Sequence, residues 1–155
     1  MNSDSPRKAD ADDAENADDA EYPELHRRTS LLYGDTTGAI LGAFYSVFSE
    51  LGSGFLEAVY TNALTALLQR AGLKVERQVC FAVEFHGQLI GNYRADLVVE
   101  SRIIVEIKAG RCIIPQHTAQ LLNYLKASRL KVGLLLNFGE TAEFRRVVCT
   151  RNTPR

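Results

Sequence analysis

The sequence predicts one α/β domain, because segments with helical periodicity and segments with strand periodicity alternate along the chain. Its 155 residues, with 46% hydrophobic content, suffice for a single domain with a sizeable core. Alternation over residues 74–85 predicts that Val75, Val79 and Phe81 lie on one face of a strand. The apolar run over residues 132–136 is typical of a strand buried on both faces. The patterns predict helices over residues 36–50, 55–71 and 115–128, and strands over residues 74–85, 97–99, 103–108, 131–137 and 144–149.

A predicted β-hairpin carries charged side chains at the margins of its two strands. Two apolar, β-branched runs flank the polar triplet at residues 100–102, which is the pattern of a hairpin. If the whole triplet forms the loop, Asp96 falls opposite Glu106, and Glu106 shares a face with Lys108. A loop of only the last two residues of the triplet would instead put Asp96 opposite Ile107. The pattern leaves this choice of register open.

The charges of the hairpin admit two interpretations. Asp96 and Glu106 could hold a hard divalent cation such as Mg²⁺, which takes carboxylate, water and phosphate oxygens as ligands. Lys108 would then be placed to orient or deprotonate a water and to offset charge on a phosphate. The alternative is an ion pair on the solvated face of an ordinary hairpin, because so short a pattern recurs by accident.

Polar residues on two predicted helices extend this candidate site. Glu57 falls in the first turn of the helix over residues 55–71, where it either interacts with the helix dipole or provides a third carboxylate. Gln120 and Tyr124 lie one turn apart on the helix that Pro115 begins, so they share a face. They could bind a water, a metal-bound oxygen or a phosphate, or they could form an ordinary polar flank.

Charge divides the chain into an acidic tail and a basic domain. Residues 1–24 hold nine acidic and two basic side chains, whereas residues 25–155 hold sixteen basic and ten acidic ones. Residues 1–28 contain almost no large apolar groups and are expected to be a disordered tail that either aids solubility or competes with nucleic acid. The domain is expected to span residues 29–155, and its positive charge suits a phosphate-binding protein.

The sequence also indicates what the protein lacks. No apolar run is long enough to span a membrane, and the N-terminus lacks the apolar segment of a signal peptide, so we expect a cytoplasmic protein without a membrane partner. Cys80, Cys112 and Cys149 lie far apart without CxxC spacing. They therefore indicate neither a zinc site nor a disulfide framework.

Taken together, the motifs resemble those of a known enzyme superfamily. The segment GFLEAVY at residues 54–60 resembles the signature of the GxxExxY family within the PD-(D/E)xK nuclease superfamily. The likeness covers residues 36–149 and implies a restriction-endonuclease-like core, in which helices flank a mixed central β-sheet. It extends through RADL at residues 94–97, VEIKA at 105–109, QLLNY at 120–124 and NFG at 137–139.

The resemblance also implies roles for the candidate residues. Asp96 and Glu106 would hold the metal with the carbonyl of Ile107, and Lys108 would position the attacking water. Ala95 stands where the superfamily name has proline, which leaves the neighbouring carboxylate in place. Residues from the two helices, namely Glu57, Gln120 and Tyr124, would complete the site.

The expected function is therefore that of a nuclease, a metal-dependent phosphodiesterase that uses Mg²⁺, with Mn²⁺ as the alternative ion. Its expected partner is nucleic acid, with DNA as the expected substrate. The rival hypothesis is a non-catalytic module that keeps the fold and binds nucleic acid or another protein. Presence of the three charged residues Asp96, Glu106 and Lys108 favours the enzyme.

Overall fold

The computed structural model describes residues 32–150, in which three helices flank a five-stranded sheet. The expected acidic tail at residues 1–28 lies outside the described residues. The predicted helices and strands are all present, with ends that differ by one or two residues except in the strand predicted over residues 97–99, which begins nine residues earlier. In chain order the elements are α2 (Gly34–Leu51), α3 (Glu57–Arg70), β1 (Val75–Phe85), β2 (Gln88–Val99), β3 (Ile103–Lys108), α4 (Pro115–Ser128), β4 (Val132–Phe138) and β5 (Ala142–Val148).

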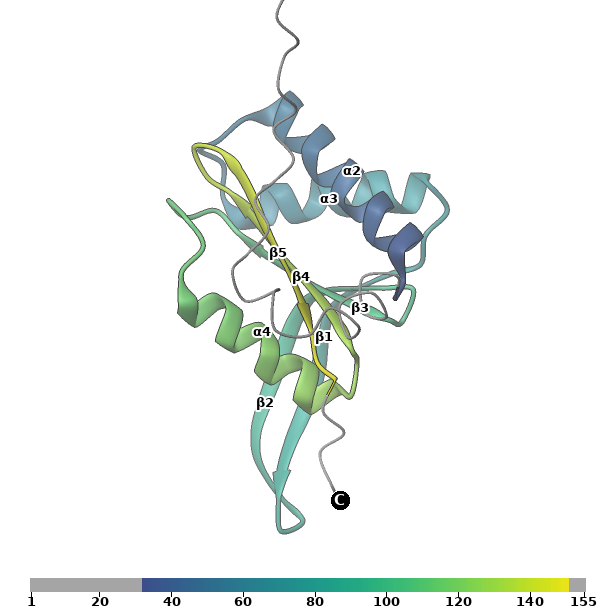
Figure 1. Ribbon diagram of the computed structural model, residues 1–155, viewed down its shortest axis with the longest axis vertical. Coiled ribbons are helices and arrows are strands. Elements are labelled where there is room, and N and C mark those ends of the chain that lie inside the picture. Colours follow the sequence, from purple (N-terminus) through teal and green to yellow (C-terminus); the bar gives the residue numbers. More distant parts are fainter. Residues whose placement is uncertain (1–31, 151–155) are drawn as a thin grey trace, which may run out of the picture. The chain divides into compact units, whose positions relative to one another are not determined.

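The sheet is mixed, and one helical crossover produces its parallel pair of strands. The strands follow the order β1-β2-β3-β4-β5, and all neighbours are antiparallel except β3 and β4. Parallel neighbours need a long connection, which α4 supplies here. Figure 1 shows α2 and α3 on one side of the strands and α4 on the other. The prediction of a restriction-endonuclease-like α/β fold with a mixed central sheet is confirmed.

Each face of the sheet has its own apolar core. On one face, α2 and α3 contribute buried residues such as Phe44 and Tyr60, which pack on alternate residues of β3 and β4. On the other face, Leu121 and Leu125 of α4 pack on the intervening residues. All seven residues of β4 are buried, as the apolar run predicted. A Cβ at Gly133 would lie 2.7 Å from Cδ1 of Leu121, so glycine permits the close approach of α4.

The register of the central hairpin corresponds to the longer of the two possible loops. Val99 pairs with Ile103, so residues 100–102 form the loop and Asp96 falls opposite Glu106. Ile107 packs into the core beneath α2 and α3, so the neighbouring side chains in β3 face α4.

The pleat of the first two strands changes face near Asp96, which the alternation did not predict. Gln78, in the middle of β1 and opposite Asp96 in the register, has a left-handed backbone with φ of 51°. Val75 packs against the core beneath α2 and α3, whereas Val79 packs against the core beneath α4. The prediction that these two valines share a face is therefore wrong. A left-handed residue reverses the local alternation of side chains. In β1 and β2, residues that would share a face in a regular strand therefore lie on opposite faces of the sheet when they are on opposite sides of this point.

The far end of the β1–β2 hairpin extends beyond α4 in Figure 1. Its tip exposes three large apolar side chains, namely Phe85, Leu89 and Ile90. Over residues 32–150, no helix combines the length and the hydropathy that crossing a bilayer requires.

Candidate active site

Asp96 and Glu106 extend the pairing of β2 and β3 through their side chains. The backbone pairs end at Leu97 and Val105. Beyond them, the N–H of Asp96 donates to Oε1 of Glu106 at 3.0 Å, and the N–H of Ile107 donates to Oδ2 of Asp96 at 2.8 Å. The N–H and C=O of one strand residue point to the same side, so the carbonyl of Ile107 also faces β2. Two carboxylates and one carbonyl therefore meet where the backbone ladder ends.

Burial makes the charged form of Glu106 costly. The residue is 4% exposed. Its removal from water, followed by the negative charge of Asp96, raises the pKa of its carboxyl from 4.5 to about 8. Lys108 acts in the opposite direction with a smaller effect. A carboxylate pair with a single nearby ammonium therefore retains a proton near neutral pH, unless another cation enters.

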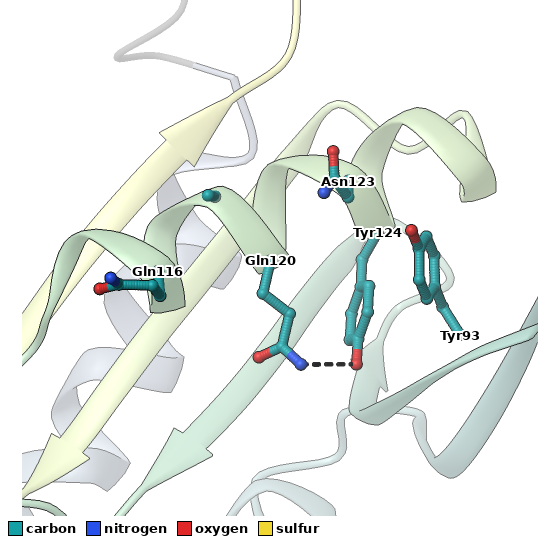
Figure 2. A pocket seen from close by; sticks show the side chains of 6 residues that line it. Tyr93, Gln116, Gln120, Asn123 and Tyr124 are labelled. Atoms are coloured by element: carbon teal, nitrogen blue, oxygen red, sulfur yellow. Dashed lines mark hydrogen bonds between the residues drawn. The ribbon is translucent and has the colours of Figure 1, made fainter.

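Lys108 is connected to α4 by a short chain of hydrogen bonds. Its Nζ donates to Oε1 of Gln120 at 3.3 Å, and Nε2 of Gln120 donates to the hydroxyl of Tyr124 at 3.1 Å. Figure 2 shows Gln120 and Tyr124 projecting from the same side of α4. Tyr124 is 7% exposed, and its burial together with the charges of Glu106 and Asp96 raises the pKa of its hydroxyl. The structure thus brings the candidate residues of the hairpin and of α4 together.

Glu57 lies near the beginning of α4 but is not joined to the carboxylate pair. It is the first residue of α3 and is exposed. Within residues 32–150, its carboxylate makes no hydrogen bond or ion pair with Asp96, Glu106 or Lys108. Its charge nevertheless acts on His117, whose pKa is lowered by burial and by Lys108 and is raised in part by Glu57. Glu57 and Lys108 therefore approach the same histidine.

Asn137 is a buried polar residue that holds the segment after Lys108, and its place in the NFG motif did not indicate this role. Its Oδ1 accepts from the N–H of Gly110 at 3.0 Å, and its Nδ2 donates to the carbonyl of Gly110 at 3.0 Å. Asn137 is fully buried. A Cβ at Gly139 would lie 2.7 Å from the same carbonyl oxygen, so this contact requires glycine. The segment NFG, which carried part of the resemblance, thus holds the chain that follows β3 against the end of β4. This contact is here named the clamp.

Tyr60 plays a comparable role before α3. Its hydroxyl donates to the carbonyl of Gly52 at 2.6 Å and accepts from the N–H of Phe55 at 3.2 Å. Its ring stacks on Phe138, with the ring centroids 4.1 Å apart. Tyr60 therefore holds the turn that leads into Glu57.

The residues at the end of the β2–β3 ladder fit a hard divalent cation. The described part of the chain contains no group of three or more His, Cys, Asp or Glu residues that could hold a metal. Mg²⁺ needs no such group, because one or two carboxylates, carbonyls, water and substrate phosphate meet its requirements. Asp96, Glu106 and the carbonyl of Ile107 provide this set of oxygens. Burial and the charge of Asp96 raise the pKa of Glu106, and a bound cation would act in the opposite direction.

Comparisons with known proteins agree with this geometry. The model of the PD-(D/E)XK nuclease superfamily matches residues 34–147, so the chain belongs to that superfamily. Its members are nucleases that generally use divalent metal ions. No curated protein matches the chain.

The crystal structure of SSO0001 has a similar fold. It matches with a TM-score of 0.51 at 19% sequence identity, over 78% of this chain. The chain spans 61% of the length of SSO0001. At this identity the likeness supports the fold alone.

Proposed function

We propose that this protein is a divalent-metal-dependent nuclease that hydrolyses phosphodiester bonds in DNA, with Mg²⁺ as the ion and Mn²⁺ as its alternative. Asp96, Glu106 and the carbonyl of Ile107 would hold the ion. When bound, the ion offsets charge on the phosphate and makes a water more acidic. The observation that carries the proposal is the pairing of two carboxylates beside Lys108, one of which, Glu106, is buried.

Lys108 positions the attacking water. An ammonium has three donors and no acceptor, and one of them is directed to Gln120. The other two can reach a water and a phosphate oxygen. In the hydrolysis, the water oxygen forms a new bond to phosphorus and the bridging P–O bond breaks. One water proton ends on the leaving oxygen and the other is released.

Gln120 and Tyr124 act by orienting Lys108. The amide oxygen of Gln120 faces the ammonium because its NH₂ group is directed to the Tyr124 hydroxyl. The raised pKa of Tyr124 keeps that hydroxyl protonated, so it can still donate its own hydrogen within the site. Glu57 contributes negative charge at the margin of the site, near His117.

Within the superfamily, we assign the chain to the GxxExxY family. The assignment rests on Gly54, Glu57 and Tyr60, which are spaced as the signature requires. Gly54 has a φ of 104°, which favours glycine, and Tyr60 holds the same turn through Gly52 and Phe55. The glycine and the tyrosine of the motif thus support the turn that places the glutamate.

The test is cleavage of labelled single- and double-stranded DNA and RNA, with and without Mg²⁺. We expect wild type to cut DNA only with metal, and Lys108→Ala and Asp96→Asn to lose at least 100-fold in rate, of order 3 kcal/mol in barrier height. Asparagine keeps an acceptor for the N–H of Ile107, so that variant should still fold. Lys131→Ala, which changes an exposed lysine, is the matched control.

Three outcomes would contradict the proposal: cleavage without metal, cleavage by both variants at the wild-type rate, or binding without any cleavage. The last outcome would favour the non-catalytic module. Preference for RNA over DNA would correct the substrate and leave the chemistry in place.

A further inference from the structure

A groove leads away from Gln120 along α4, on the side of the β1–β2 hairpin. Its first part, about 290 Å³ in volume, is lined by Tyr93 and by polar residues of α4 that include Gln120 and Asn123. Its second part, about 510 Å³, includes Lys126 and Arg129. Both parts are lined by Tyr93 and Asn123, so they adjoin at these two residues, and together they are here named the α4 groove.

The α4 groove begins at the candidate active site and follows the helix axis. Gln116, Gln120, Asn123 and Ala127 recur at three- and four-residue spacing, so they form a single stripe along α4. From Gln120 to Arg129 the groove runs roughly 14 Å, at 1.5 Å per residue. Gln120, near the N-terminal end of this stripe, is also the residue that bonds Lys108. A polymer that occupied the groove would therefore continue directly from the site.

The side chains of the groove suit a nucleic acid strand. The Tyr93 ring lies against Tyr124, with centroids 5.0 Å apart, and Figure 2 shows it beside the pocket. Asn123, Lys126 and Arg129 are exposed. In the stretch from residue 32 to residue 150, their side chains and the Tyr93 hydroxyl have no hydrogen-bond or ion-pair partner. An aromatic ring can stack on a base, an amide can bond a base edge, and cations can hold phosphates.

Arg129 occupies a position that ordinarily favours glycine. It follows the last residue of α4 with a left-handed backbone, at φ of 61°. Glycine adopts this conformation at helix ends without steric cost, whereas an arginine does not. Arginine at this position thus carries a steric cost that glycine would avoid.

We propose that the α4 groove binds an unpaired nucleic acid strand that continues from the cleaved phosphodiester, with a base stacked on Tyr93 and phosphates held by Lys126 and Arg129. This inference rests on the proposed nuclease function and names the form of its substrate. The strand is unpaired because bases within a duplex stack on one another and leave no free face for Tyr93. Glu84 also lines the groove, and its carboxylate repels the phosphates.

The test is direct binding of a short fluorescein-labelled oligothymidylate to the full chain in EDTA, measured by fluorescence anisotropy. Tyr93→Leu, which keeps apolar cover over Tyr124, should weaken binding roughly 5- to 150-fold, the range of one base stack. Tyr93→Phe is the matched control and should bind like wild type. A labelled oligouridylate, measured in parallel, distinguishes DNA from RNA as the strand.

Two further variants test the charges of the groove. Arg129→Gly should weaken binding and lower the salt dependence by about 0.7 in the slope of log K against log salt concentration. The same variant should melt no lower than wild type, because glycine relieves the left-handed backbone. Glu84→Gln should tighten binding.

The proposal is overturned if Tyr93→Leu and Arg129→Gly bind as wild type does, or if a duplex binds as tightly and responds equally to Tyr93→Leu. Lys108→Ala separates this result from that of the nuclease test, because it should lose cleavage while its binding still depends on Tyr93. Binding that depends on Tyr93 without any cleavage would refute the nuclease and retain the groove. Cleavage with binding that is indifferent to Tyr93 would refute the groove and retain the nuclease.

Discussion

Replacing Glu106 with glutamine is expected to stabilise the metal-free protein at pH 8 and to have a much smaller effect at pH 5. The pKa of Glu106 is raised from 4.5 to about 8, first by burial and then by Asp96. Between these two values the folded state keeps a proton that the unfolded state has released. The folded state therefore loses stability as pH rises through this window. Glutamine carries no charge, so the variant does not pay this penalty.

The magnitude follows from the size of the pKa change. At 1.36 kcal/mol for each pKa unit, the penalty at pH 8 has an upper limit of about 4 kcal/mol. Water entry and small movements reduce such penalties, so we expect roughly 1–3 kcal/mol. For a domain of this size, each kcal/mol of added stability raises the Tm by roughly 4 °C. Glutamine still accepts from the N–H of Asp96, so no hydrogen bond is lost.

The assay is thermal unfolding of wild type and Glu106→Gln from pH 5 to pH 8, in EDTA and then with Mg²⁺ or Mn²⁺. Metal should raise the Tm of wild type more at pH 8 than at pH 6, because binding must displace the proton of Glu106. It should have little effect on the variant. Glu140→Gln, at an exposed position, is the control. A constant difference between wild type and Glu106→Gln at all pH values would refute the reasoning.

Three further predictions concern the residues that support the site. Gly133→Ala should cost roughly 1–3 kcal/mol in denaturant unfolding, because its Cβ would lie 2.7 Å from the buried Leu121, and an unchanged midpoint would contradict this packing. Asn137→Ala should cost roughly 1–3 kcal/mol, because it leaves the N–H and C=O of Gly110 unpaired. The cleavage rate of Asn137→Ala should fall by more than the loss of folded protein explains. If the folded variant keeps the wild-type kcat, the clamp does not position Lys108. Tyr60→Phe should keep the ring stack but speed hydrogen exchange in the turn before α3, and equal exchange rates would exclude the hydroxyl as its anchor.

The helix that carries Gln120 and Tyr124 could be predicted nearly to the residue. Its expected span of residues 115–128 is confirmed as Pro115–Ser128. Proline at the first position and apolar spacing along one face are local signals, which the backbone geometry of a helix converts directly into positions. The shared face of Gln120 and Tyr124 follows from the same geometry and is confirmed by their hydrogen bond.

The loop of the central hairpin could not be decided by local signals. Glu100 and Ser101 both have a φ of 54°, a left-handed conformation that neither residue favours on its own. The carboxylate of Glu100 accepts from the N–H of Lys74 at 2.6 Å, and the N–H of Glu100 donates to the carbonyl of Lys74. A segment 26 residues earlier in the chain thus holds the loop, and with it the alignment of Asp96 opposite Glu106.

By itself, the sequence determined the order of the helices and strands, the face that Glu106 shares with Lys108 and the face that Gln120 shares with Tyr124. These features follow from backbone periodicity, which depends only on near neighbours. Only the tertiary structure decided that Lys108 meets Gln120 and that Glu106 is buried enough to retain its proton. Contact and desolvation depend on every group that surrounds a side chain, and at this site those groups come from strands and helices far apart along the chain.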